Sequence, residues 1–158
     1  MRYILLDRIT ECEPGKRARG LKAVTLTDDV LHDHFPDYPI LPGALVVEAA
    51  AQLAGFLLEV SANTPGEEPR RALLVQIDRA KFHRPAQPGD SIELFAELGQ
   101  ALDAAAKIEV GADVRGERVM RATLTFMLKR IDSERVHEQR RYLYRLWTRD
   151  LPEPVVIP

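Results

Sequence analysis

The stretch that decides the fold is HFPDYPILPGALVVEAAAQLAGFLLEV, residues 34–60. It begins with a proline-rich segment containing Pro36, Pro39 and Pro42, which excludes a regular helix or a central strand and indicates a stiff extended loop. Strong helix formers follow on almost every face from Ala44 to Val60, a pattern typical of a buried helix. Pro42 suits the first position of that helix, because its missing N–H would have no partner there. We therefore expect a stiff loop that leads into one buried helix.

On both sides of this helix, apolar and polar residues alternate as they do in strands. Before it, residues 9–13 and 17–26 flank a turn at Pro14-Gly15, and a short helical turn begins near Asp28. After it, alternation continues through residues 73–82, 92–98, 106–114 and 120–128, with a turn at Arg115-Gly116. A slip of phase near Asp78-Arg79 predicts a β-bulge. One buried helix followed by an antiparallel meander indicates an α+β fold, with the sheet wrapped around the helix.

The last part of the chain reads as an addition to this unit. We expect residues 1–131 to form the main domain and residues 132–158 to form a helical extension with an extended tail. The helix is predicted over Ser133–Trp147, packed on the sheet or on a neighbouring subunit because an exposed apolar stripe is a liability. Its apolar stripe is predicted to comprise Val136, Leu143, Leu146 and Trp147.

Length and composition fit one ordinary globular domain. The chain has 158 residues, 46% of them hydrophobic and 29% charged. A formal net charge of -2 argues against a binder of duplex nucleic acid. The single cysteine, Cys12, excludes an intramolecular disulfide and fits a reducing compartment. The apolar stretch within residues 1–7 is too short for a secretory signal, and charged residues follow it at once. We therefore expect a cytoplasmic protein without a membrane span.

Two polar side chains interrupt the apolar helix. Glu48 and Gln52 are the only ones between Pro42 and Phe56. A carboxyl group on a buried helix loses solvent, which favours its neutral, proton-donating form. The spacing of four places Gln52 one turn along the same face, where it can hold the carboxyl group by a hydrogen bond. An acid held in this way can deliver a proton near neutral pH.

The start of the helix is a second feature with chemical potential. N–H groups in a first helical turn have no partner within the helix, and the helix dipole favours negative charge there. Because Gly43 has no side chain to block a ligand, a substrate carbonyl could bind its N–H while an α-proton leaves. His34, held by the stiff loop in front of the helix, would be the base.

Each of these residues also has a purely structural interpretation. A lone histidine in a loop is more often exposed or structural than catalytic. Glu48 and Gln52 could be a satisfied polar pair in the core, and Gly43 could serve only the helix start. The clustering of a base, an acid and an oxyanion donor within residues 34–48 favours a catalytic site.

The segment His34–Gly43, followed by Glu48-Ala-Ala-Ala-Gln52, resembles the signature of the FabZ-type 3-hydroxyacyl-acyl-carrier-protein dehydratases. The similarity extends to residues 5–9, 13–16 and 78–90, and covers about residues 3–130 in all. The family has a hot-dog fold, in which a curved antiparallel sheet wraps a long central helix and two chains dimerise edge to edge. That architecture agrees with the alternation described above.

The resemblance implies a role for each candidate residue. His34 would take the α-proton, Glu48 would protonate the departing hydroxyl, Gly43 would bind the thioester carbonyl, and Gln52 would steady the acid. The related FabA type has aspartate at the acid position, so Glu48 favours the FabZ type. The implied activity is that of a hydro-lyase that converts 3-hydroxyacyl-acyl-carrier-protein to the trans-2-enoyl form, in fatty-acid or related lipid or polyketide synthesis. Neither a metal nor a cofactor is expected.

The resemblance also implies partners. It predicts a homodimer, with a trimer of dimers as the larger alternative, in which base and acid come from opposite chains. The stiff loop between His34 and Glu48 points the same way, because it hinders an approach within one chain. An acidic carrier protein predicts a basic rim, although solvated strand-edge charges are an equal alternative. Candidates for the rim are Arg70, Arg71, Arg79, Lys81, His83 and Arg84.

Some features depart from the family pattern. Asp33 stands where the family has glycine, His32 adds another titratable group, and residues 131–158 have no recognised counterpart. Two other functions stay open: a hot-dog thioesterase that hydrolyses the thioester, and a non-catalytic acyl-binding partner. The sequence sets neither the acyl chain length nor the choice between carrier protein and coenzyme A.

Overall fold

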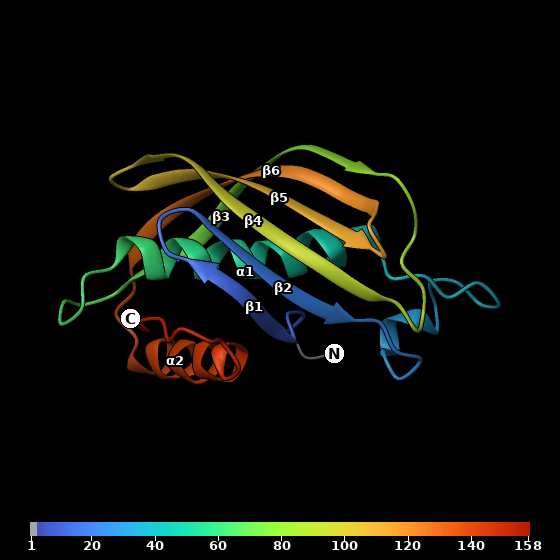
Figure 1. Cartoon of the computed structure of the whole chain (residues 1–158), viewed down its shortest axis with the longest axis horizontal. Coiled ribbons are helices and arrows are strands. Elements are labelled where there is room, and N and C mark those ends of the chain that lie inside the picture. The colour runs from blue at the N-terminus through green and yellow to red at the C-terminus, as the bar shows by residue number, and fades with distance from the viewer. Residues whose placement is uncertain (1–2) are drawn as a thin grey trace.

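One long helix, α1 (Gly43–Ala62), runs through the centre of the molecule, and an antiparallel sheet curves around it (Figure 1). This computed structural model describes residues 3–158. Apolar residues occupy most faces of α1, and side chains such as Leu53, Phe56 and Leu57 are fully buried. The expected α+β fold with a buried central helix is confirmed.

The sheet has six strands in the order β1-β2-β4-β5-β6-β3. The strands β4, β5 and β6 form the predicted meander, whereas β3 pairs with β6 and so lies at the far edge. Both edges of the sheet, β1 and β3, therefore flank α1 from opposite sides (Figure 1). The strands are β1 (Arg8–Glu13), β2 (Arg17–Ala23), β3 (Arg70–Phe82), β4 (Ser91–Leu102), β5 (Ala105–Val114) and β6 (Glu117–Arg130).

The predicted turns and the predicted bulge are present. Gly15 has φ +81° in the turn between β1 and β2, a conformation that glycine adopts without strain. Arg115 and Gly116 have φ 52° and 79° in the hairpin between β5 and β6, as a two-residue turn of type I′ requires. The pairing of β3 with β6 shifts register between Asp78 and Lys81, which confirms the bulge.

The start of α1 and the end of β2 differ from the expected boundaries. The helix α1 begins at Gly43, and Pro42 is its N-cap rather than its first helical residue. The strand β2 ends at Ala23 rather than at residue 26, because the chain then turns into a short 3-10 helix, η1 (Asp29–Leu31). The proline-rich loop between η1 and α1 has no regular structure, as expected.

The helix α2 (Glu134–Thr148) follows β6 and packs beside β1 (Figure 1). Its predicted apolar stripe is partly wrong, because Leu146 is 41% exposed and Tyr144 is buried in its place. Tyr144 and Trp147 lie one turn apart on the face that α2 turns toward the body of the protein. The ring of Tyr144 meets Phe56 of α1 edge to face, with ring centroids 5.0 Å apart. The helix therefore packs on its own chain.

The helix α1 is long and apolar enough to cross a membrane by length and composition alone. Of its most apolar window, 61% is buried inside the fold. It is the core helix of the fold and not a membrane span.

Candidate active site

Glu48 and Gln52 lie together on α1, as the spacing predicts. The Nε2 atom of Gln52 donates to Oε1 of Glu48 over 3.0 Å and to the carbonyl of Tyr3 over 3.2 Å. The Oε1 atom of Gln52 accepts from the backbone N–H groups of Leu5 at 2.9 Å and Leu6 at 3.2 Å. Gln52 is thus held by the N-terminal segment, and it fixes the Glu48 carboxyl group in turn.

Tyr3 is a further neighbour of Glu48, which the sequence did not indicate. Burial and, after it, the Glu48 carboxylate with its hydrogen bond raise the pKa of the Tyr3 phenol. The Tyr3 side chain is 60% exposed, so the phenol lies over Glu48 on the side that faces solvent. No local spacing reveals this contact, because Tyr3 and Glu48 lie 45 positions apart in the chain.

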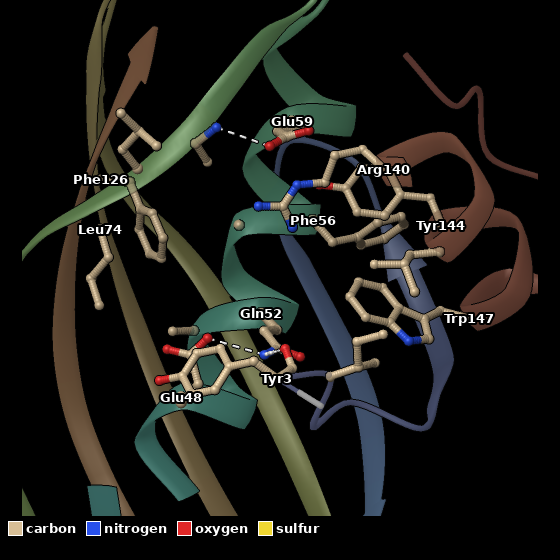
Figure 2. A pocket seen from close by; sticks show the side chains of 16 residues that line it. Tyr3, Glu48, Gln52, Phe56, Glu59, Leu74, Phe126, Arg140, Tyr144 and Trp147 are labelled. Atoms are coloured by element: carbon tan, nitrogen blue, oxygen red, sulfur yellow. Dashed lines mark hydrogen bonds between the residues drawn. The ribbon is translucent and has the colours of Figure 1, made fainter. Parts of the chain in front are cut away.

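Glu48 faces a cavity of about 290 Å³. The cavity is lined by the N-terminal segment, α1, the start of β3, β6 and α2. Figure 2 shows Tyr3, Glu48 and Gln52 gathered at one end of it, with Glu59 and Arg140 toward the other. Its middle is apolar, because Gly55 and the neighbouring alanine and aromatic side chains line it. A carboxyl group beside a cavity with apolar walls is suited to act on a ligand bound there.

A second cavity, of about 560 Å³, opens at the start of α1 and includes Gly43 and Phe82. As the first residue of the helix, Gly43 has an N–H without a partner inside α1. A Cβ atom at this position would lie 2.7 Å from the ring of Phe82. Glycine therefore allows the helix start to pack closely on the Phe82 ring at the end of β3, and a larger residue would displace that ring.

His34 lies in the loop before α1, and its side chain is half-buried. Its carbonyl accepts a hydrogen bond from Ile40 N over 2.9 Å, and Leu41 N donates to Ala86 O over 2.8 Å, so both ends of the loop are fixed. The imidazole stacks on the ring of Phe35 with centroids 4.1 Å apart. The bond between His34 and Phe35 is a cis peptide.

The four predicted site residues are not all brought together within one chain. Glu48 and Gln52 line the first cavity and Gly43 lines the second. Among the described residues 3–158, the lining of neither cavity includes His34. In that same part of the chain, no cluster of His, Cys, Asp or Glu side chains could hold a metal ion.

The titratable neighbours of His34 point into solvent. Nδ1 of His32 lies 3.1 Å from Oδ1 of Asp33, and these two side chains are 90% and 91% exposed. The carboxylate of Asp33 thus contacts His32, which immediately precedes it in the chain.

One expectation for the basic rim is wrong. The Arg71 side chain is only 1% exposed, and its Nη1 atom lies 2.7 Å from Oε2 of the equally buried Glu59. Its Nε donates to Nδ1 of His137 on α2 over 3.0 Å. Arg71 therefore joins β3, α1 and α2 inside the protein, and it cannot meet a partner. Arg79, Lys81 and His83 are exposed, as a rim requires.

Comparison with solved structures shows what the fold is. The chain superposes on a subunit of the dehydratase heterocomplex ApeI:P from Xenorhabdus doucetiae with a TM-score of 0.68 at 15% identity, covering 87% of this chain and 90% of the other. A hypothetical thioesterase with coenzyme A from Streptococcus pneumoniae gives a TM-score of 0.62 at 14% identity, with coverages of 80% and 88%. At these identities the likeness shows the architecture alone, which is the hot-dog fold.

Sequence comparison gives the family. Residues 1–123 match the FabA-like domain. The 3-hydroxyacyl-acyl-carrier-protein dehydratase FabZ of Bacillus velezensis is 40% identical over 126 residues, covering 80% of this chain and 87% of the relative. The dehydratase of the same name from a Wolbachia is 36% identical over 129 residues, covering 82% and 88%. The chain therefore belongs to the FabA-like family and, within it, to the FabZ-type dehydratases.

Proposed function

We propose that this protein removes water from 3-hydroxyacyl groups carried on acyl carrier protein and gives the trans-2-enoyl thioester, in fatty-acid or related lipid synthesis. The observation that carries the proposal is the Glu48 carboxyl group, fixed by Gln52 at the wall of a cavity, in a chain of the FabZ type. The reaction needs one group to remove a proton and another to deliver one, and needs no redox partner.

We assign His34 as the base and Glu48 as the acid. His34 takes a proton from the carbon next to the thioester carbonyl, and negative charge builds up on the carbonyl oxygen. The N–H of Gly43 stabilises that charge at the helix start, where the dipole adds to the effect. Glu48 then protonates the hydroxyl on the next carbon, which leaves as water while the double bond forms. Gln52 acts as a positioning residue, because it touches Glu48 and not the reacting atoms.

We further propose that the protein is a homodimer and that each site takes His34 from one chain and Glu48 from the other. The strand β3 supports this, because it lies at the edge of the sheet and presents a row of exposed apolar side chains. An apolar edge strand readily pairs with another chain, and a two-fold axis would cover both copies. The exposed residues are Leu73, Leu74, Val75, Ile77 and Phe82.

The carrier protein would dock near the end of β3. Arg79, Lys81 and His83 are exposed there, close in the chain to Phe82, which packs on Gly43. This basic group suits an acidic carrier protein and lies on the side of the proposed oxyanion site. We place the protein in the cytoplasm, with residues 1–131 as the dehydratase domain and residues 132–158 as an added element.

The test is turnover of 3-hydroxyacyl-acyl-carrier-protein, followed by mass spectrometry of the acyl group. The wild-type protein should form the enoyl thioester, and His34→Ala and Glu48→Gln should each lower kcat by about 10²- to 10⁴-fold. His32→Ala is the matched control, because the His32 side chain is 90% exposed and pairs with Asp33. Release of free thiol would identify a thioesterase, and binding without turnover would identify a non-catalytic partner. Either result would overturn the proposal.

A further inference from the structure

The helix α2 forms one wall of the cavity that contains Glu48. Arg140, Leu143, Tyr144 and Trp147 of α2 all line it. The match to the FabA-like domain ends at residue 123, so this wall lies outside the family match. The shape and polarity of the cavity beyond Glu48 are therefore properties that this chain adds to the family fold.

The wall is fixed in place by buried polar contacts. Arg71 connects Glu59 of α1 to His137 of α2, at 2.7 Å and 3.0 Å. The Nη2 atom of Arg71 also donates to the carbonyl of Pro158 over 3.4 Å, which ties down the end of the chain. Burial, followed by the Glu59 carboxylate, holds the pKa of Tyr144 well above its ordinary value, so its hydroxyl stays neutral. A ligand in the cavity would meet a rigid surface.

The far end of the cavity carries net positive charge. The carboxylate of Glu59 is occupied by Arg71 and by the backbone N–H of Ala72 at 2.9 Å. Arg140 forms no ion pair with any residue between 3 and 158. Figure 2 shows its guanidinium extending from α2 toward Phe56 and Glu59. The charge of Arg140 is therefore available to a ligand that reaches this end.

The two ends of the cavity are a fixed distance apart along α1. Glu48 and Phe56 are eight residues apart, and Glu48 and Glu59 are eleven, so the span is roughly 12 to 16 Å at 1.5 Å per residue. The wall between the ends is apolar and includes Gly55, whose missing side chain leaves room beside Phe126. This space suits an acyl chain of moderate length that begins at Glu48.

We propose that this cavity holds the acyl chain of the substrate and that Arg140 selects a chain whose far end carries a carboxylate. The inference rests on the proposed function, because it takes the reacting carbons to lie at Glu48. An alkyl end beside Arg140 would remove water from a charged group without replacing its hydrogen bonds, which is unfavourable. A carboxylate there would form a charge-assisted hydrogen bond with the guanidinium.

The experiment compares two 3-hydroxyacyl-pantetheine thioesters of equal length, one ending in a methyl group and one in a carboxylate. Wild-type protein should prefer the carboxylate-ended substrate in kcat/KM by about 10-fold or more, the factor expected for a hydrogen bond between charged groups. Arg140→Met should abolish the preference, and Arg140→Lys should keep part of it. Arg145→Met is the control, because Arg145 lies on the exposed side of α2. If Arg140 were only structural, Arg140→Met would lower stability and affect both substrates alike, which would overturn the inference.

A second readout does not require turnover. Trp147 is the only tryptophan in the chain and lines the cavity, so its fluorescence should change when an acyl-pantetheine binds there. A saturable change with the carboxylate-ended thioester, weakened by Arg140→Met, would support the inference even if dehydration were not observed and the proposed function failed. Normal dehydration with equal preference for both chain ends would overturn the inference and leave the proposed function intact.

Discussion

Gln52 has two separable tasks, and two substitutions tell them apart. Its Oε1 atom accepts from the N–H groups of Leu5 and Leu6, which anchors the N-terminal segment. Its Nε2 atom donates to Glu48 and to the carbonyl of Tyr3. Gln52→Leu removes all four hydrogen bonds at similar volume. Gln52→Glu keeps an oxygen that can accept both backbone hydrogen bonds, and it removes the two hydrogen bonds that Nε2 donates.

The expected sizes follow from these contacts. Leaving one buried N–H unsatisfied costs about 1–3 kcal/mol, and Gln52→Leu leaves two, those of Leu5 and Leu6. Because water reaches part of this site, we expect the free energy of unfolding to fall by about 2–4 kcal/mol. Gln52→Glu should cost less than about 1 kcal/mol, because both backbone N–H groups keep an acceptor. The new carboxylate would lie close to Glu48, since the atoms it replaces are 3.0 Å apart. Two carboxylates at such a distance do not ionise independently, and they share a proton.

The assays are urea unfolding and the pH dependence of kcat/KM. Gln52→Glu should move the limb of the profile that reports the acid to higher pH, because like charge favours the protonated pair. Gln52→Leu should lose stability without that displacement. Equal stability of the two variants would refute the anchoring role of Gln52. An unchanged profile in Gln52→Glu would refute its contact with the catalytic acid.

Three further substitutions test other parts of the account. Gly43→Ala should lower kcat by about 10²-fold, because the new Cβ would press on the Phe82 ring and displace the oxyanion N–H. The double variant Gly43→Ala/Phe82→Leu should recover much of the lost kcat, because leucine is smaller than phenylalanine. No recovery would contradict this packing argument. Arg71→Met should lower the free energy of unfolding by about 3–5 kcal/mol in a denaturant titration, because it leaves the buried Glu59 carboxyl group without its cation. A loss under about 1 kcal/mol would contradict a stabilising role of this pair. Lys81→Glu should raise KM for carrier-bound substrate in a salt-sensitive way and leave KM for the pantetheine thioester unchanged. If KM is unchanged for both substrates, Lys81 is not part of the docking surface.

The central helix and its polar pair could be predicted because both depend on local spacing. Apolar residues on all faces of residues 44–60 indicate burial wherever the partners lie, and a separation of four places Glu48 and Gln52 on one face of any helix. The bulge near Asp78 was likewise visible as a change of phase in the alternation.

Contacts between distant segments could not be predicted in this way. The sequence predicts Arg71 as part of the basic rim, because its partners Glu59 and His137 lie 12 and 66 residues away in the chain. The sequence predicts Leu146 rather than Tyr144 in the apolar stripe of α2, since an aromatic ring with a hydroxyl fits either a surface or a core. Phe56 and Glu59 contact Tyr144 from α1, and Trp147 packs beside it on α2.

Complementation between two inactive variants tests the central claim most directly, since it requires the activity, both catalytic residues and the shared site at once. Equal amounts of His34→Ala and Glu48→Gln chains, unfolded and refolded together, should form about half heterodimers. Each heterodimer would hold one intact site and one site without either group, so activity should recover to about a quarter of the wild-type value. If both groups came from one chain, every site in the mixture would lack one of them. No recovery, with subunit exchange demonstrated by mass spectrometry, would contradict the account.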